Sequence, residues 1–241
     1  MNILAIGNSF STDAMRYLHR IARADGVQLN TTNLYIGGCP LERHFRNMLT
    51  GNASYELQCN GEATGFFVSL DQALLNRAWD VITIQQASPF SPKADSYEPY
   101  GQELVAHVRK YVPKAKILVH QTWAYEQGSA KLESLGYTDH KAMFADLENA
   151  YERLARKVHA DGIIPSGQLL QDMLAAGFEQ VHRDTFHAHL GWGRYGLGLL
   201  WYRVLTGNSV LENSFRDFDV PVTEEQVTAI KALVEQVKPV L

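Results

Sequence analysis

The sequence has little cysteine, no long apolar run and no cluster of basic residues. Its 241 residues include two cysteines, Cys39 and Cys59, whose spacing gives no positive support for a zinc site or a disulfide. No stretch approaches the roughly twenty apolar residues that a membrane span needs, and the N-terminus lacks the features of a signal peptide. We therefore expect a cytoplasmic protein with reduced thiols and no membrane partner.

The charge balance argues against nucleic acid as a partner. The formal net charge is −4, and the lysines and arginines are spread along the chain. Without a basic patch, binding to a phosphate backbone lacks its electrostatic basis. Apolar residues at 46% and charged residues at 20% are typical of a globular protein. No linker rich in Pro, Gly or Ser divides the chain, so we predict a single domain over residues 1–241.

Short apolar segments alternate with segments of helical period. The first, residues 2–7, is a continuous apolar run ended by a glycine, as expected for a strand buried on both faces. Residues 50–67 have no clear period and are expected to form an irregular excursion over the sheet edge. The alternation predicts the α/β class, with a mostly parallel sheet covered by helices on both faces. Strands are predicted at 2–7, 32–36, 79–85, 116–121 and 161–165, and helices at 14–24, 69–77, 97–111, 140–159, 166–176, 191–206 and 223–237.

Ser9 follows the first predicted strand and stands near the start of the next helix. In an open parallel sheet the ligand site lies at the carboxyl ends of the strands, so the Ser9 hydroxyl is expected at that edge. The N–H groups at the start of a helix favour a developing oxyanion nearby. A serine at this place is also a common helix N-cap, so the segment alone does not identify a nucleophile.

Two further segments at strand ends could supply oxyanion donors. Gly37 and Gly38 follow the second strand, and glycine lets a backbone N–H approach a ligand closely. Gln85 and Gln86 follow the third strand, where a buried amide needs a hydrogen-bond partner. The simpler interpretations are a tight turn for the glycines and hydrogen bonds to loop backbone for the glutamines.

Residues 183–190 supply a carboxylate and an imidazole. Asp184 lies three residues before His187, so it can fold back and hold the Nδ1–H of the ring, which leaves Nε2 as a general base. His189 is the competing base, and a helix entry capped by Asp184 is the alternative without chemistry. A metal site at His182, His187 and His189 is less favoured, because the spacing is irregular and no carboxylate or thiol ligand accompanies it.

The order of these segments resembles the motif blocks of the SGNH (GDSL-like) hydrolase superfamily. The segment around Ser9 is similar to the first block, although Asn8 stands where Asp is usual. Gly38, or Gly37, matches the second block, and the segment from Asp184 to His187 matches the last. The resemblance covers nearly the whole chain. It implies a three-layer, flavodoxin-like sandwich with a five-stranded parallel sheet and no cofactor.

The resemblance also implies roles for individual residues. Ser9 is the implied nucleophile, His187 the base that Asp184 orients, and the Gly38 N–H an oxyanion donor. The third block departs from the family, because the usual Gly-x-Asn-Asp is replaced by a segment that starts with two glutamines. A similar block occurs in the sialic-acid and xylan acetylesterase branches and in an uncharacterised branch. By that analogy Gln85 is the implied oxyanion donor, with Gln86 as the alternative.

The expected function is that of a serine esterase that removes a small acyl group, acetyl foremost, from a small-molecule ester such as an acylated sugar. Trp123, Tyr125 and Trp192 could line its pocket or serve as core anchors. Two alternatives stay open: a lipid or thioester hydrolase of the same fold, and a degenerate α/β domain that binds a ligand without turnover. A nucleotide-binding protein is less favoured, because no Gly-rich phosphate loop follows the first strand.

Overall fold

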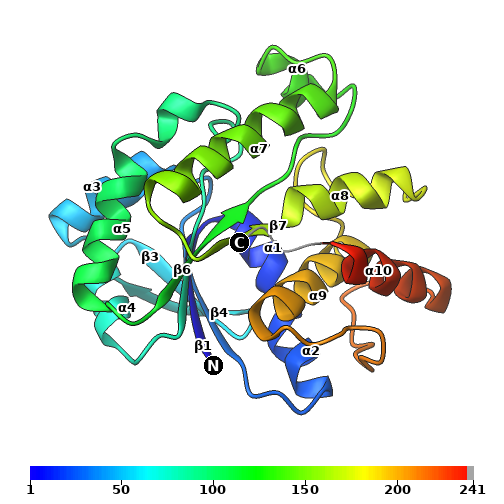
Figure 1. Cartoon of the computed structure of the whole chain (residues 1–241), viewed down its shortest axis with the longest axis horizontal. Helices are drawn as coiled ribbons and strands as arrows, with labels where there is room; N and C mark the ends of the chain where they lie inside the picture. Colours follow the sequence, from blue (N-terminus) through cyan, green and yellow to red (C-terminus); the bar gives the residue numbers. More distant parts are fainter. Residues whose placement is uncertain (238–241) are drawn as a thin grey trace.

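The computed structural model describes residues 1–237 and contains a seven-stranded sheet in the order β4-β3-β2-β1-β5-β6-β7 (Figure 1). The neighbours of β1 are β2 on one side and β5 on the other, so the strand order switches direction at β1. In open α/β sheets this switch is where ligands bind. The strands are β1 (Asn2–Gly7), β2 (Asn30–Tyr35), β3 (Tyr55–Cys59), β4 (Glu62–Val68), β5 (Val81–Ile84), β6 (Lys116–Gln121) and β7 (Gly162–Pro165).

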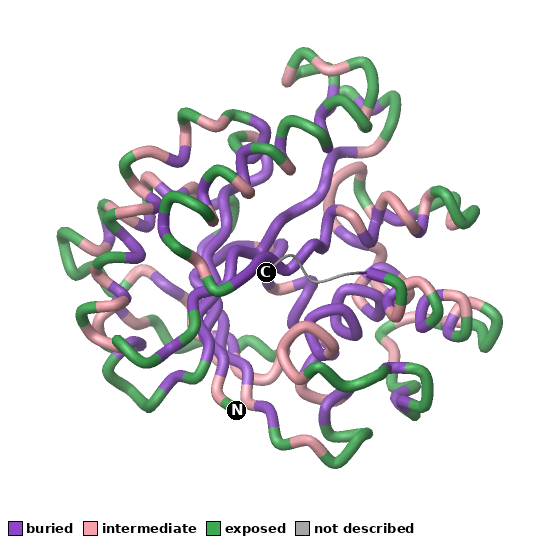
Figure 2. The backbone as a smooth tube through the Cα atoms, viewed as in Figure 1, coloured by how far each residue is buried: buried purple, intermediate pink, exposed green. Residues whose placement is uncertain are grey.

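Helices cover both faces of the sheet and enclose two apolar cores (Figures 1 and 2). One core lies under α1 (Ser9–Met15), α2 (Leu18–Ala24), α8 (Ser166–Ala175), α9 (Trp192–Thr206) and α10 (Glu224–Gln236). The other lies under α3 (Leu41–Thr50), α4 (Leu70–Leu75), α5 (Tyr100–Tyr111) and α7 (His140–Lys157), with the short α6 (Ala130–Ser134) and η1 (Ala94–Tyr97) in the connections. No helix among these residues is both long and apolar enough to cross a membrane.

The central strands are buried on both faces, which explains their continuous apolar sequences. Ile3, Leu4 and Ala5 of β1 are fully buried, and alternate residues contribute to opposite cores. β1 pairs in parallel with β2 and β5, which places their carboxyl ends together. This arrangement confirms the predicted α/β class and the layered architecture.

The sheet differs from the prediction in its two outer strands. Residues 50–67 do not form an irregular excursion; they contain β3 and most of β4, an antiparallel hairpin added to the five parallel strands. β4 is exposed along most of its length, Phe66 and Phe67 at 72% and 61% of their surface, so it lacks the alternation that marks a half-buried strand. The missed signal was Asn60-Gly61 at the turn, where both residues have positive φ. The sheet is therefore seven-stranded and mixed.

The helix predictions need two corrections near the site. The predicted helix at 14–24 is two helices, α1 and α2, and α1 begins at Ser9 because Asn8 caps it. At the break between them Tyr17 is fully buried, and its hydroxyl donates to the Leu190 carbonyl (2.7 Å). The helix α3, which follows Pro40, and the short helix α6, which carries Lys131 and Ser134, were not predicted.

Candidate active site

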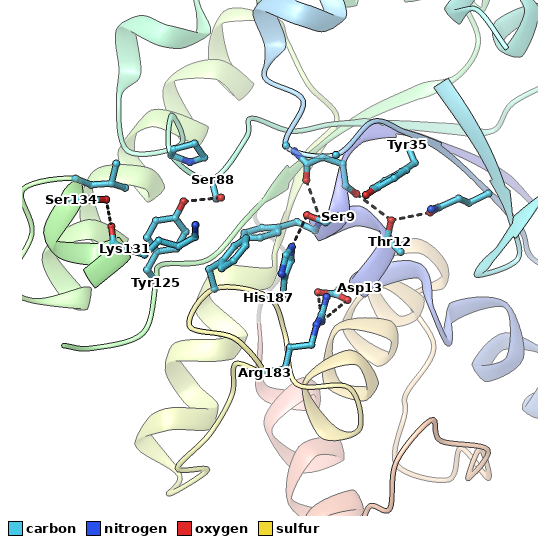
Figure 3. A pocket seen from close by; sticks show the side chains of 18 residues that line it. Ser9, Thr12, Asp13, Tyr35, Ser88, Tyr125, Lys131, Ser134, Arg183 and His187 are labelled. Atoms are coloured by element: carbon cyan, nitrogen blue, oxygen red, sulfur yellow. Dashed lines mark hydrogen bonds and ion pairs between the residues drawn. The ribbon is translucent and has the colours of Figure 1, made fainter. Parts of the chain in front are cut away.

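A pocket of about 640 Å³ opens at the carboxyl ends of β1, β2 and β5 (Figure 3). Ser9 and His187 point toward each other at its floor. Gly37 and Gly38, which follow β2, and Ser88, which follows β5, contribute to its walls. The structure therefore brings together segments from four widely separated parts of the sequence at the predicted edge of the sheet.

The Ser9 hydroxyl is not used as a helix cap. Asn8 occupies the N-cap position, and its Oδ1 accepts a hydrogen bond from the Phe10 N–H (3.0 Å). Ser11 completes the capping box with the Asn8 backbone. The chain packs tightly here, because a Cβ at Gly7 would lie 2.1 Å from the Ser11 Oγ. Ser9 Oγ is consequently free to bond His187 Nε2 at 2.9 Å.

His187 is held on its other side by Asp184. The Asp184 Oδ2 lies 2.7 Å from His187 Nδ1, and Oδ1 accepts the His187 backbone N–H at 2.9 Å. A carboxylate only accepts hydrogen bonds, so Nδ1 carries the proton and Nε2 is the acceptor for the serine hydroxyl. Partial burial raises the pKa of Asp184, but the hydrogen bonds from His187 outweigh it, and the net pKa lies below the usual value. The three side chains form an ordered Ser-His-Asp arrangement.

The loop that carries Asp184 and His187 has an unusual backbone. Thr185 has φ of 74°, in the left-handed region that β-branched residues rarely adopt. Two hydrogen bonds hold the loop from outside: the Glu126 N–H donates to the Thr185 carbonyl (2.8 Å) and the Trp123 indole to the Phe186 carbonyl (2.7 Å). The surrounding structure thus imposes a strained conformation that directs His187 at Ser9.

The competing histidines have other contacts. His189 Nδ1 accepts the Gly191 N–H, and its ring stacks on Trp192 at 3.3 Å. His182 Nε2 bonds the Ala124 carbonyl, and burial lowers its pKa to about 4. Within residues 1–237 no three His, Cys, Asp or Glu side chains converge as metal ligands, and both cysteines are free.

Two backbone N–H groups are available near Ser9. Gly38 has φ of 60° and lines the pocket with Gly37. Over residues 1–237 the Gly38 N–H has no hydrogen-bond acceptor, and the Ser9 N–H lies in the first turn of α1, where such groups lack intrahelical partners.

Gln85 does not line the pocket, which corrects its predicted role as a direct oxyanion donor. Its side chain is buried; Nε2 donates to Asn8 Oδ1 (2.7 Å), and Oε1 accepts from His120 Nδ1 (2.7 Å). Gln86, the alternative oxyanion donor, is also hydrogen-bonded elsewhere in the protein. Its Oε1 accepts the Leu41 N–H, and its Nε2 donates to Ser96. The oxygen and the nitrogen of each buried amide have a hydrogen-bond partner within the protein, as buried polar atoms generally do.

Gln85 instead belongs to a buried chain of hydrogen bonds that ends at the pocket. Because its Oε1 only accepts, His120 Nδ1 carries the proton and Nε2 accepts from the Ser166 hydroxyl (3.1 Å). At the other end, Asn8 Nδ2 donates to the Cys39 carbonyl (3.2 Å), so the Ser9 turn is tied to the turn that carries Gly38. Burial lowers the pKa of His120 to about 3, so the histidine in this series of hydrogen-bonded side chains is neutral.

Sequence reasoning missed a cluster of charged side chains beneath the loop that carries Asp184 and His187. Asp13, fully buried on α1, accepts two hydrogen bonds from Arg183 Nη1 (2.9 Å each) and one from the Ala188 N–H (3.1 Å). Arg194 Nε donates to the same carboxylate at 2.9 Å. Arg183 and Ala188 flank the segment that contains Asp184 and His187. The helix that begins at the serine therefore also holds both ends of the histidine loop.

The three aromatic candidates have different positions. Tyr125 lines the pocket, and its hydroxyl donates to Ser88 Oγ (2.9 Å). Trp123 is fully buried and stacks on Phe10 with ring centroids 4.1 Å apart, so it is a core anchor. Trp192 lies outside this pocket, against His189.

The fold is similar to that of solved structures of the SGNH-like α/β class. A proposed SGNH hydrolase from Slackia heliotrinireducens shares 21% identity, with a TM-score of 0.61 over 84% of this chain and 97% of its own. A carbohydrate esterase family 3 protein from Talaromyces cellulolyticus shares 11% identity, with a TM-score of 0.55 over 86% of this chain and 97% of its own. At these identities the likeness establishes the fold alone.

The chain belongs to the DUF4886 family, a domain of unknown function, which matches residues 2–234. A DUF4886 family protein from Bacteroides uniformis shares 32% identity and superposes with a TM-score of 0.90, over 98% of this chain and 93% of its own. No curated protein matches the chain.

Proposed function

We propose that this protein is a serine hydrolase that cleaves an ester through an acyl-enzyme. The observation that carries the proposal is the continuous path from Ser9 Oγ to His187 Nε2 (2.9 Å) and from His187 Nδ1 to Asp184 (2.7 Å). A nucleophile bonded to a base, which is itself oriented by a third group, is the arrangement that acyl transfer requires. Folds of this class also occur in esterases and lipases.

In the first half of the reaction, Ser9 Oγ attacks the acyl carbon while its proton passes to His187 Nε2. Asp184 keeps the proton on Nδ1 and stabilises the imidazolium that forms. His187 then gives its Nε2 proton to the leaving alcohol oxygen. In the second half, water loses a proton to His187 and attacks the acyl carbon; the carboxylic acid leaves as Ser9 recovers its proton.

The oxyanion is stabilised by the backbone N–H groups of Ser9 and Gly38. Both residues line the pocket, and the Asn8 side chain ties their two turns together. Donors fixed before the reaction stabilise developing charge without reorganising, which is the main source of their catalytic effect. Gln85 has an indirect role, because its side-chain amide holds the Asn8 side chain in place.

The substrate is a small acyl ester, acetyl foremost, of a polar alcohol such as a sugar. The residues that line the pocket with Ser9 include Thr12, Gln58, Ser88 and Tyr35, whose side chains can bond hydroxyl groups. Among the described residues, the aliphatic and phenylalanine side chains of the lining are Phe10, Pro89, Leu135 and Phe186, four of the eighteen residues that line it. This lining favours the carbohydrate ester over the lipid or thioester alternative.

Turnover of p-nitrophenyl acetate by the wild type and by Ser9→Ala tests the proposal. Wild-type hydrolysis that is lost in Ser9→Ala, with an unchanged melting temperature, supports it. A wild-type protein that shows no turnover, or a Ser9→Ala variant as active as wild type, contradicts it. In the first of those cases the ligand-binding alternative takes its place.

A further inference from the structure

The fixed charges that line the pocket are not balanced. They belong to Asp13, Arg183 and Lys131. Asp13 and Arg183 pair with each other, and both oxygens of the Asp13 carboxylate are occupied. Within residues 1–237 no carboxylate forms an ion pair with Lys131. The pocket therefore carries an unpaired positive charge in a protein whose formal net charge is −4.

Two aromatic rings position the Lys131 ammonium without neutralising it. Nζ lies 4.2 Å from the centroid of the Phe186 ring and 6.0 Å from that of Tyr125. The Phe186 ring in turn lies 3.9 Å from the His187 ring, between centroids. Cation–π contacts of this kind hold a cation in place but leave its charge available to an anion. The ammonium is thus separated from the base by one aromatic ring.

A hydroxyl donor stands on the same wall as Lys131. Ser88 Oγ accepts the Tyr125 hydroxyl at 2.9 Å, and its own proton has no acceptor within the described residues. Figure 3 shows Ser88, Tyr125 and Lys131 grouped on the side of the pocket opposite Thr12 and Tyr35. A carboxylate placed there could pair with Lys131 and accept from Ser88.

We infer that the substrate is an ester whose alcohol portion carries a carboxylate, which Lys131 binds. This inference rests on the proposed function and narrows its substrate class. The acyl group is small and is held at Ser9, so the anionic group belongs to the leaving alcohol, which extends from Ser9 toward the wall formed by Lys131 and Ser88. An unpaired cation in a cleft also raises the local concentration of anionic substrates.

The first test compares meta-acetoxybenzoate with the neutral meta-acetoxybenzamide, which carry the same acyl group. The measured quantity is the ratio of their kcat/KM values. Because Lys131 is exposed, we expect Lys131→Met, which keeps the apolar stem over Phe186, to lower this ratio by up to about fivefold, the effect of one solvent-exposed ion pair. Lys131→Arg should keep the ratio near that of the wild type. The matched control is Lys110→Met, because Lys110 also lies over an aromatic ring, that of Tyr111, but does not line the pocket.

Two outcomes of this test separate the inference from the proposed function. A Ser9-dependent enzyme whose ratio is the same in Lys131→Met and wild type overturns the inference and leaves the esterase proposal standing. A wild type that hydrolyses neither these compounds nor p-nitrophenyl acetate overturns the esterase proposal. The charge preference is then decided by calorimetric binding of the two compounds to Ser9→Ala and to Ser9→Ala/Lys131→Met. A preference for the benzoate that disappears without Lys131 supports the anion site, and equal or absent binding overturns it.

Discussion

At the scale of single residues, the site depends on which nitrogen of His187 carries the proton. Asp184 bonds both the ring Nδ1–H and the backbone N–H of His187, so one carboxylate sets the tautomer and the ring position. The neutral Nε2 that results is the atom that faces Ser9. Without the carboxylate, the same histidine could present a protonated Nε2, which cannot accept the serine proton.

The substitution Asp184→Asn tests this dependence. An amide can donate to Nδ1 and thereby place the proton on Nε2, so we expect kcat to fall by about a thousandfold or more. Asp184 is half-exposed and its loss removes no core contact, so the melting temperature should stay within a few degrees of the wild type. A kcat within tenfold of the wild type would show that Asp184 does not set the tautomer of His187.

Gln85 gives a second prediction at this scale, because a positioning residue and a direct oxyanion donor have different signatures. Gln85→Ala leaves the His120 N–H without its acceptor and Asn8 without a donor, so we expect a stability loss of about 1 to 3 kcal/mol. Turnover should fall about tenfold as the Ser9 turn shifts.

The matched control is Gln86→Ala. Gln86 is equally buried and bonded, but it contacts Leu41 and Ser96 rather than Asn8. Denaturant unfolding and kcat are measured on both variants. We expect a similar stability loss and a smaller loss of kcat for Gln86→Ala. A Gln85→Ala protein with unchanged stability and a kcat reduced a hundredfold would restore the direct donor role.

Local spacing determines how much of the site could be predicted from the sequence. The Asp184–His187 pair lies within one turn, so its geometry follows from a separation of three residues. The partners of Gln85 lie 77 and 35 residues away along the sequence, and no local pattern shows which buried group it meets. The residue type at the strand end was therefore recognised, but its role was assigned wrongly.

At the scale of elements, α1 joins the two halves of the site. It begins at Ser9, and Asp13 one turn later holds Arg183 and the Ala188 N–H on the histidine loop. These contacts span 170 and 175 residues of sequence, so they could not be predicted from either segment alone. Sequence reasoning located both segments at one sheet edge and did not identify what fixes their separation.

We predict that Asp13→Asn weakens this link. The neutral amide loses the ion pairs with Arg183 and Arg194, at a cost of about 2 to 4 kcal/mol because Asp13 is fully buried. A small displacement of the loop should lower kcat by about ten- to a hundredfold with little change in KM.

Asp219→Asn is the control for Asp13→Asn. Asp219 pairs with Arg16 and Arg194 on the outer side of the same network, and those pairs lower its pKa to about 2, but it does not contact the histidine loop. Its variant should lose stability with a smaller loss of kcat. Equal losses of kcat in the two variants would mean that Asp13 contributes only to stability.

The hairpin of β3 and β4 shows a different limit of prediction at this scale. All five parallel strands were predicted. The sequences of β1, β5 and β7 are mostly apolar because both of their faces are buried, whereas β2 buries the polar residues Thr32 and Asn33. β4 lies at the sheet edge with most of its side chains in solvent. Its sequence therefore does not need to alternate apolar and polar residues. The Asn60-Gly61 pair was the available sequence signal for a hairpin. It is distinctive only where apolar and polar residues alternate on both sides of the turn.

At the scale of the whole molecule, buried neutral histidines link stability to pH. Burial lowers the pKa values of His44 and His120 to about 3 and that of His182 to about 4. Below an unfolded-state pKa of about 6.5, the unfolded chain binds protons that the folded chain excludes. Stability is therefore fully present above that pH and declines as the pH falls toward about 3.

Between those two pH values, we expect each of these histidines to lower the free energy of unfolding by up to about 1.4 kcal/mol for each unit that the pH falls. Urea unfolding at pH 7.5 and at pH 5, read by fluorescence, measures the difference. His120→Gln should reduce the slope of stability against pH, because one titrating group is removed. A free energy of unfolding that does not change between the two pH values would contradict the account.

The proposed activity depends above all on Ser9 being an activated nucleophile. The most direct measurement is the site of covalent labelling by a fluorophosphonate, mapped by mass spectrometry of the digested protein. We expect a single adduct on Ser9, with none on the buried Ser11 two residues away, and loss of labelling in Ser9→Ala and His187→Ala. Labelling that persists in Ser9→Ala, or a wild type that remains unlabelled, would contradict it.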